Sequence, residues 1–387
     1  MEMINNIITG SGSVEIKESI RSNTVKLVVG GIFFLILSIG VFIYQFNKLQ
    51  VDQSFYLWKR FEWGYLFLMF LVVPLDPIAG SMRIWIISRV IHPGVTYWTC
   101  FKSGLTNIGT AMLTPSQTGG GLGQIYILCR GGVTIGSATA ICFISFTGTM
   151  LVLLGIGLYS LFFTDIGNME DIFRYAVMIF LFITLSMLLI ALFPGHLRRI
   201  IRKTSIAFGN PMTGSSPPQN LCSSESEDKS ETYDHCKRGL SERIIELFEN
   251  YHNSLRCYLQ VGKINFICVL VLSFAFLFFR SLAAFLCLRF LGIHQPSLSH
   301  IVEIQLVLLF FIYFAPTPGG AGISEVMSLT IMSSFIPMEL APYYNLFWRT
   351  ATLYLSGVAG LIFLSHAVVV QGKETLVNIG SRHVEDI

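Results

Sequence analysis

The chain has 387 residues, of which 53% are hydrophobic and only 13% are charged, and its mean hydropathy is +0.64. This composition is typical of an integral membrane protein and excludes a sizeable soluble domain, because apolar segments take up most of the chain. The formal net charge of +3 is too small to indicate a nucleic-acid partner. The eight cysteines form no C-x-x-C motif and have no metal-ligand spacing with histidine, so we expect no metal and no cofactor.

Six apolar runs are near or above the roughly 20 residues that a helix needs to cross a bilayer. In chain order they are Leu27–Tyr44, Trp63–Ile87, Val133–Phe163, Tyr175–Phe193, Ile264–Leu288 and Leu346–Val370. No small-residue cleavage site follows the first run, so we expect an uncleaved helix there and not a signal peptide. The predicted fold class is an all-α polytopic membrane protein that forms a single membrane domain over residues 1–387.

Two further apolar runs are too short to span, and each ends in a Thr-Pro pair followed by glycines. The runs are Trp98–Leu113, before Thr114-Pro115 and Gly120-Gly121-Leu122-Gly123, and Ile301–Ala315, before Thr317-Pro318 and Gly319-Gly320-Ala321-Gly322. Short apolar stretches, Gly123–Cys129 and Ile323–Ile336, follow the two breaks. Backbone freed from a helix inside lipid must be buried in protein or line a wet cavity. We therefore expect two broken or re-entrant hairpins, with Pro115 and Pro318 as the helix-breaking residues.

The same order of features occurs in both halves of the chain: an arginine-bearing helix, a proline turn, a short apolar run, a Thr-Pro break and a long helix. Arg83 and Pro93 begin this order in the first half, and Arg280 and Pro296 begin it in the second. We predict a first repeat at 25–194 and a second at 263–370, inverted so that the broken elements approach the membrane midplane from opposite faces. Chance similarity is the alternative, since the chain contains 34 glycines.

The polar region between the repeats sets the predicted orientation. Lysine and arginine are frequent over residues 194–263 and absent from 164–171, so the positive-inside rule places the former in the cytoplasm, together with both termini. Lys48, Lys59 and Arg60 would then be external, which counts against this topology. Within the region we expect a disordered linker at 205–240 and an amphipathic helix at 241–259 lying at the membrane interface. A cytoplasmic extension of the next span is the alternative for that helix.

Charged side chains inside the predicted spans need an explanation, because each costs about 2.5–3.5 kcal/mol at a helix centre. Asp76 and Arg83 are seven residues apart, which places them on one helical face. Pro74 and Pro77 flank Asp76, and a helix loosened there exposes carbonyl groups. In the alternative interpretation, Arg83 and Arg89 extend to the interface and Asp76 caps a kink.

The glycine-rich breaks suit an anionic ligand. Glycine allows close approach of the backbone, and a helix that begins just after the glycines directs N–H groups at a phosphate or carboxylate. Arginines nearby would bind a phosphodiester with two hydrogen bonds. The candidate substrate-binding residues are Arg83, Arg280, Arg349, Glu325, Gly120, Gly121, Gly123, Gly319, Gly320 and Gly322. Alternatively, the glycines only permit close helix crossing.

Glu325 lies three residues after Gly322, near the start of the predicted half-helix, and Arg349 is placed to neutralise it. A buried structural pair and a gating or substrate role both remain open. The secondary candidates are Asp76, Lys102, Gln124 and Glu303. No nucleophile with a nearby base, no paired acidic metal motif and no nucleotide-binding loop is recognisable, so we expect no catalytic residues and a transporter-like protein instead of an enzyme.

The motif Thr-Pro-Gly-Gly-x-Gly-x-x-Glu, followed about two dozen residues later by Trp-Arg, resembles the lysylphosphatidylglycerol synthase transmembrane region family. This family is also called flippase-like and includes the membrane half of the multiple-peptide-resistance factor. The resemblance extends from the first helix to Ser365. The residues that match the family's second motif are Pro318, Gly319, Gly320, Gly322, Glu325 and Arg349. The family's first motif usually reads Gly-Glu with an arginine soon after, whereas this chain has Gly123-Gln124 with Ile127.

The resemblance implies a bacterial inner-membrane protein with flippase-like function. The soluble aminoacyl-transfer domain of the bifunctional family members is absent from the sequence, so we expect no synthesis of lysyl-lipid. The leading hypothesis is translocation of a phospholipid or lipid-linked headgroup, with a membrane lipid as the substrate. Two alternatives remain: a membrane-embedded glycosyl- or phosphoryl-transferase acting on a lipid carrier, and a non-catalytic partner of a separate lipid-modifying synthase.

Overall fold

The computed structural model describes residues 61–163, 170–192, 240–333 and 335–385, with a few helical positions between 36 and 47. Every regular element among these residues is a helix and none is a strand, which confirms the all-α class. The predicted first span, Leu27–Tyr44, and the predicted linker at 205–240 lie almost entirely outside the described residues.

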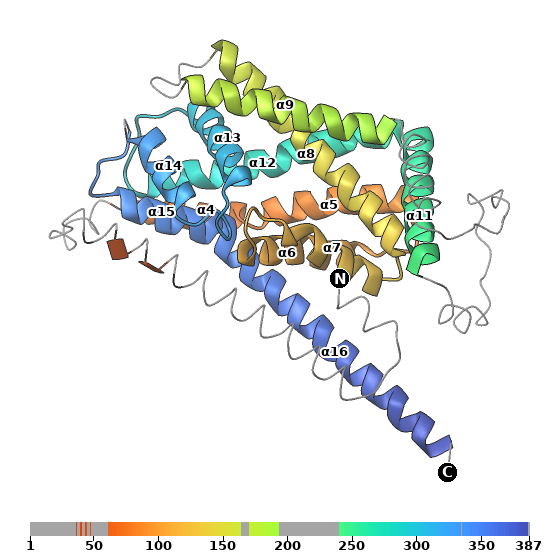
Figure 1. The fold of residues 1–387 in the computed structure, drawn as a ribbon. Helices are drawn as coiled ribbons and strands as arrows, with labels where there is room; N and C mark the ends of the chain where they lie inside the picture. The colour runs from red at the N-terminus through yellow and green to blue at the C-terminus, as the bar shows by residue number, and fades with distance from the viewer. Residues whose placement is uncertain are drawn as a thin grey trace.

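The helices follow one another in a single bundle (Figure 1). They are α4 (Trp63–Val72), α5 (Leu75–Ile91), α6 (Tyr97–Leu113), α7 (Gly119–Arg130), α8 (Ile135–Phe163), α9 (Glu170–Leu192), α11 (Leu240–Val261), α12 (Lys263–Phe290), α13 (Leu298–Phe314), α14 (Ile323–Met332), α15 (Ala341–Arg349), the π-helix η4 (Thr350–Tyr354) and α16 (Leu355–Glu385). The boundaries of α6 and α13 agree closely with the two short runs predicted from the sequence.

Four stretches of the described residues are long and apolar enough to cross a membrane. They are Trp63–Ile91, Ile135–Phe163, Ile264–Phe290 and Ala341–Val370. Each corresponds to one of the six predicted spans. Helix α9 covers most of a fifth, although its apolar part is the shorter segment Val177–Leu189. The total of six spans stays a prediction.

The first of these stretches is kinked where the sequence indicated. Helix α4 ends at Val72 and α5 begins at Leu75, because Pro74 has no N–H to donate and its ring is incompatible with a continuous helix. Asp76 therefore lies in the first turn of α5, where the helix dipole favours a carboxylate.

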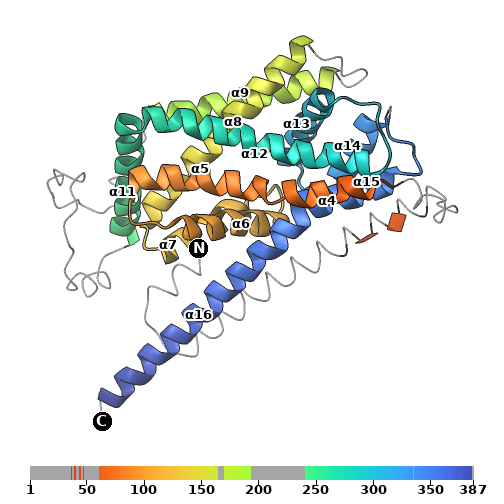
Figure 2. The same cartoon turned by 180° about the vertical axis from the view of Figure 1, so that it is seen from behind.

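Helix α12 is central to the bundle and packs against α4, α5, α8, α11, α13 and α15. Its 28 residues extend about 42 Å. One core cluster contains Val269 near its start and includes Leu255 and Tyr258 of α11, while a second contains Leu277 and several buried residues between Ala283 and Phe290 in its later part. Figures 1 and 2 both show α11 lying across the ends of α5, α8 and α12. The two core clusters thus mark opposite ends of the molecule.

The two broken segments form helical hairpins whose bases lie at opposite ends of α12. Val95, just before α6, and Leu128, near the end of α7, belong to the cluster that contains α11. Ile301 in α13 and Met332 at the end of α14 belong to the other cluster. The hairpin tips meet, because Pro115 and Pro318 form an isolated antiparallel β-bridge.

A glycine-lined crossing fixes the first hairpin against α16. A Cβ atom on Gly360 would lie 1.9 Å from the carbonyl oxygen of Leu105, and one on Gly109 would lie 2.7 Å from the carbonyl oxygen of Gly357. Only glycine permits two helix backbones to approach this closely. Helix α16 then continues past the bundle (Figure 1).

Candidate functional site

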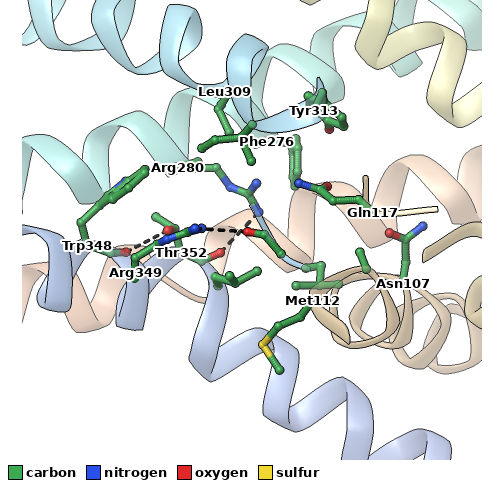
Figure 3. Close-up of a pocket in the computed structure, with 15 residues that line it drawn as sticks. Asn107, Met112, Gln117, Phe276, Arg280, Leu309, Tyr313, Trp348, Arg349 and Thr352 are labelled. Carbon is green, nitrogen blue, oxygen red and sulfur yellow. Dashed lines mark hydrogen bonds between the residues drawn. The ribbon is translucent and has the colours of Figure 1, made fainter. Parts of the chain in front are cut away.

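A cavity lies where the two hairpin tips meet, beside the middle of α12. It is lined by Asn107, Ile108, Ala111, Met112, Gln117, Phe276, Arg280, Leu309, Ile312, Tyr313, Gly319, Trp348, Arg349, Thr352 and Leu353. Asn107 and Gln117 lie on one side of it, and Trp348 and Arg349 on the other (Figure 3). Its volume is about 80 Å³. The cavity is therefore large enough to hold water.

Three of the predicted substrate-binding residues line this cavity: Arg280, Arg349 and Gly319. The other predicted substrate-binding residues do not line the cavity and lie elsewhere in the hairpins or in neighbouring helices. The cavity also joins residues from α6, α12, α13 and η4, which are far apart in the sequence. The sequence therefore indicated where the site lies but only part of its lining.

The second break is held by a buried ion pair. Arg349 Nε donates to Glu325 Oε1 at 2.8 Å, and the two side chains are 6% and 9% exposed. Glu325 Oε2 accepts from the Gly322 N–H at 2.6 Å and from the Ser324 hydroxyl at 2.9 Å. Arg349 Nη2 donates to Ser324 Oγ and to the carbonyl oxygen of Gly319 at 3.1 Å. The structure thus brings Glu325 and Arg349 together as expected, in a densely hydrogen-bonded pair.

The glycines of the second break are needed for their backbone conformation. Gly319, Gly320 and Gly322 have φ angles of 57°, 71° and 83°, in the left-handed region that disfavours side chains. Helix α14 begins immediately after them, at Ile323. The N–H of Gly322 is bound by Glu325, so at this position the helix start binds its own carboxylate and not a ligand.

Arg280 is held in a looser ion pair. Its Nε and Nη2 atoms both donate to one oxygen of Asp76, Oδ2, at 3.2 Å, and Nη2 also donates to the carbonyl oxygen of Thr352 at 3.4 Å. Charge-assisted N–H···O bonds are usually about 2.7–2.9 Å long. The second oxygen of Asp76, Oδ1, is buried without a partner. Arg280 is therefore the less firmly paired of the two arginines at the cavity.

Arg83 is buried behind the cavity, with only 8% of its surface exposed. Its Nη1 donates to the hydroxyls of Thr149, at 2.5 Å, and Ser273, at 2.9 Å, while its Nε has no partner. Phe276, which lines the cavity, lies within 5.5 Å of the Arg83 guanidinium and 4.9 Å of that of Arg280. Asp76 and Arg83 were predicted to share a helical face. The ion-pair partner of Asp76, however, is Arg280 of α12 and not Arg83.

The chain matches the family described as the lysylphosphatidylglycerol synthase TM region over residues 25–360. It belongs to that family. A relative named "UPF0104 membrane protein", from Archaeoglobus fulgidus, is 20% identical over 342 residues, which cover 87% of this chain and 96% of the relative. No solved structure matches the chain significantly. The family assignment and the apolar helices together identify the chain as an integral membrane protein.

In this member of the lysylphosphatidylglycerol synthase TM region family, the first break differs from the sequence-based expectation. Helix α7 begins at Gly119, so its glycines lie inside the helix and not before it. A Cβ atom on Gly120 or Gly123 would meet α6 side chains at 2.9 Å and 2.5 Å, whereas Gly121 has no neighbour within 4 Å. Gly120 and Gly123 therefore permit close packing of the hairpin, which was the alternative interpretation.

Two secondary candidates lie away from the cavity lining. Lys102 is near the aromatic rings of Trp98 and Phe363, and Glu303 lies in the second turn of α13. A third, Gln124, contacts the lining indirectly, because its Oε1 accepts from Asn107 Nδ2 at 2.6 Å. Among the described residues, no group of three histidine, cysteine, aspartate or glutamate side chains is arranged to hold a metal ion.

Sequence reasoning missed several lining residues. Asn107 and Tyr313 carry polar groups but belong to no motif, Gln117 lies within the first break but was not a candidate, and Trp348 was noted only as the neighbour of Arg349. The π-helix η4, which supplies Thr352, follows Arg349 directly. Such single-turn π segments are frequent at functional sites. A polar residue in a hairpin arm that faces a Thr-Pro break is the signal that would have identified Asn107.

Proposed function

We propose that this protein translocates a phospholipid or lipid-linked headgroup across the cytoplasmic membrane, through the point at which the two hairpin tips meet. The observation that carries the proposal is the β-bridge between Pro115 and Pro318 beside a cavity whose lining includes two arginines. A break in the first half of the chain thus contacts its counterpart in the second half. Such paired breaks are typical of transport sites near the bilayer midplane.

The inverted repeat and the membrane topology belong to this proposal. The hairpin bases at opposite ends of α12 support entry of the two hairpins from opposite membrane faces. In this arrangement both termini are cytoplasmic, six helices span the bilayer, and α11 lies at the cytoplasmic interface. Inverted repeats of this kind allow alternating access by rocking one half against the other.

Arg280 is the residue that we assign to the headgroup. A phosphate oxygen entering the cavity would be a second anionic acceptor for Arg280, whose ion pair with Asp76 uses a single carboxylate oxygen at 3.2 Å. Transport requires binding that is strong enough for entry and weak enough for release. The long ion pair of Arg280 with a single oxygen of Asp76 meets this requirement better than the pair of Arg349 and Glu325, which is short and has further hydrogen bonds around it.

The cavity, at about 80 Å³, is too small for a phospholipid headgroup. The described state is therefore closed, and translocation requires the tips to separate at Pro115 and Pro318. In this scheme the Glu325–Arg349 pair keeps the second tip rigid while it moves, and Arg83 provides a fixed positive charge behind Phe276.

Reconstituted vesicles test this function. Phosphatidylglycerol with a fluorescent acyl tail is placed in both leaflets, and an impermeant reductant bleaches the outer one. Vesicles without protein should retain about half of the fluorescence, and vesicles with the protein should lose nearly all of it. Arg280→Gln should slow the loss about tenfold or more, since hydrogen bonds to charged groups contribute about 1.5–3 kcal/mol.

The matched control is Arg89→Gln, which removes an exposed arginine near the end of α5 and should leave the rate unchanged. Retention of half the fluorescence by vesicles that contain folded wild-type protein would overturn the proposed function. Equal rates for Arg280→Gln and the wild type would leave translocation standing but would remove Arg280 from the site.

A further inference from the structure

The two hairpins differ in the charge of the pair that each contributes near the cavity. In the second hairpin, the residue shortly after the glycines is Glu325, which is ion-paired with Arg349. In the first hairpin it is Gln124, which forms a neutral pair with Asn107. Gln124 is only 4% exposed, and its Nε2 donor has no partner. A buried donor without a hydrogen bond is unfavourable, so the first hairpin keeps an unsatisfied amide group next to the lining residue Asn107.

The buried charges around the cavity do not cancel. The charged side chains that line the cavity, pair with its lining arginines or contact its lining Phe276 are Asp76, Arg83, Arg280, Glu325 and Arg349. Three guanidinium groups and two carboxylates leave one positive charge in excess. Since an uncompensated charge is strongly unfavourable in a low-dielectric environment, the site favours a ligand with one negative charge.

The cavity has no feature that suits an ammonium group. None of the residues that line it is acidic, and the two carboxylates behind it are already bound by Arg280 and Arg349. Two of the three aromatic rings of the lining already have a guanidinium group nearby. Phe276 has the guanidinium groups of Arg83 and Arg280 within 5.5 Å and 4.9 Å of its ring centre, and Arg349 lies 5.5 Å from the ring of Trp348. An amine in the headgroup would be desolvated there without a counter-ion.

The polar lining instead matches hydroxyl groups, which both donate and accept hydrogen bonds. Asn107 and Gln117 contribute amides from the first hairpin, and Tyr313 contributes a phenol from α13. Asn107 and Gln117 lie across the cavity from Arg349 (Figure 3). A phosphodiester near the arginines would thus place its alcohol portion beside the amides.

We infer that the cargo is a monoanionic lipid whose headgroup is a phosphodiester of a polyol without an amine, and that the Asn107–Gln124 pair recognises its hydroxyl groups. This inference rests on the proposed function and narrows its substrate class. Asn107 contacts the polyol directly. Gln124 is a positioning residue, because it accepts the Asn107 amide hydrogen and so fixes which atoms of Asn107 face the cavity.

A panel of fluorescent-tail lipids in the vesicle assay tests the inference. Phosphatidylglycerol and phosphatidylinositol carry one negative charge and hydroxyls, phosphatidylserine carries the same net charge with an ammonium, and phosphatidylethanolamine is zwitterionic. The first two should cross at least about tenfold faster than the last two, the effect of one unmade polar contact. If phosphatidylglycerol crosses faster than phosphatidylinositol, glycerol is the favoured polyol. If phosphatidylinositol crosses faster, the favoured polyol is inositol.

Gln124→Glu adds a carboxylate beside Asn107 and should reduce the preference for phosphatidylglycerol over phosphatidylserine about tenfold or more. The readout is the ratio of the two rates, which a merely structural role of Gln124 would not change. Gln260→Glu, the same chemical change at an exposed position of α11, is the control and should leave the ratio unchanged.

The outcomes separate the inference from the function on which it rests. Transport of phosphatidylserine as fast as phosphatidylglycerol would overturn the inference and leave translocation standing. A folded Gln124→Glu protein with the wild-type ratio would remove the pair from recognition. If none of the four lipids crosses in the presence of folded protein, the proposed function itself is wrong and the inference falls with it.

Discussion

Replacing Glu325 by glutamine tests whether its contact with Arg349 is a structural ion pair. In the native protein, both carboxylate oxygens face donors: Oε1 faces Arg349 Nε at 2.8 Å, and Oε2 faces the Gly322 N–H at 2.6 Å. A glutamine amide has only one oxygen. In either orientation its NH₂ group points at another donor, so Glu325→Gln removes a charge and also sets a donor against a donor.

The burial of the pair sets the size of the effect. With side chains only 6% and 9% exposed, solvent cannot compensate the charge that is left. Removing one partner of a buried ion pair costs about 3–5 kcal/mol. We expect Glu325→Gln and Arg349→Gln each to lower the free energy of unfolding by about this amount. The double variant leaves neither charge unpaired, so its loss should be about 2–3 kcal/mol smaller than the sum of the two.

Reversible unfolding by SDS titration in mixed micelles measures these free energies. Glu339→Gln is the control, because this exposed glutamate near the second break should change stability by less than about 0.5 kcal/mol. A loss below about 1 kcal/mol in each single variant would refute the reasoning, since it is well under the cost of an unpaired buried charge. Strict additivity in the double variant would equally show that the two side chains do not interact.

Two glycine pairs give further stability predictions with the same assay. Gly322→Ala should cost about 1–2 kcal/mol because its φ of 83° is unfavourable for alanine, whereas Gly121→Ala, in the first turn of α7 with open space around it, should gain up to about 1 kcal/mol. Gly360→Ala should cost about 1–3 kcal/mol or more because its Cβ would collide with the Leu105 carbonyl of α6, whereas Gly155→Ala, which meets no atom within 4 Å, should not destabilise the protein. Equal effects within either pair would contradict the backbone geometry described here.

The features that could be predicted from the sequence are those with a local chemical cause. Proline removes a donor and clashes with the preceding turn, so the breaks at Pro74, Pro115 and Pro318 were evident before any packing was known. The pairing of Glu325 with Arg349 was predicted correctly. Each residue lies at the end of a segment, and the second break brings these two segments together. The all-α class followed directly from the lengths of the apolar runs.

The features that could not be predicted depend on which helix faces meet. Asp76 binds Arg280, 204 residues away, and spacing along α5 carries no information about that partner. The start of α7 was misplaced because glycines were taken to precede the helix, whereas close packing on α6 stabilises them within it. Asn107 and Gln117 were missed for the same reason, since their role exists only once the two tips are in contact.

The central claim is that the two breaks meet and that their separation lets a lipid pass. Residues directly opposite each other in an antiparallel pair have Cα atoms about 4.5–5.5 Å apart, within the range that a disulfide spans. Pro115→Cys with Pro318→Cys, in a protein whose native cysteines are replaced, should therefore oxidise to an intramolecular disulfide.

The most direct measurement is the rate of phosphatidylglycerol translocation in vesicles that contain this double-cysteine protein, before and after reduction. We predict that the oxidised protein is inactive, that reduction restores transport, and that neither single-cysteine variant responds to oxidant. Transport by the oxidised protein at the reduced rate would contradict the claim that lipid passes between the two tips.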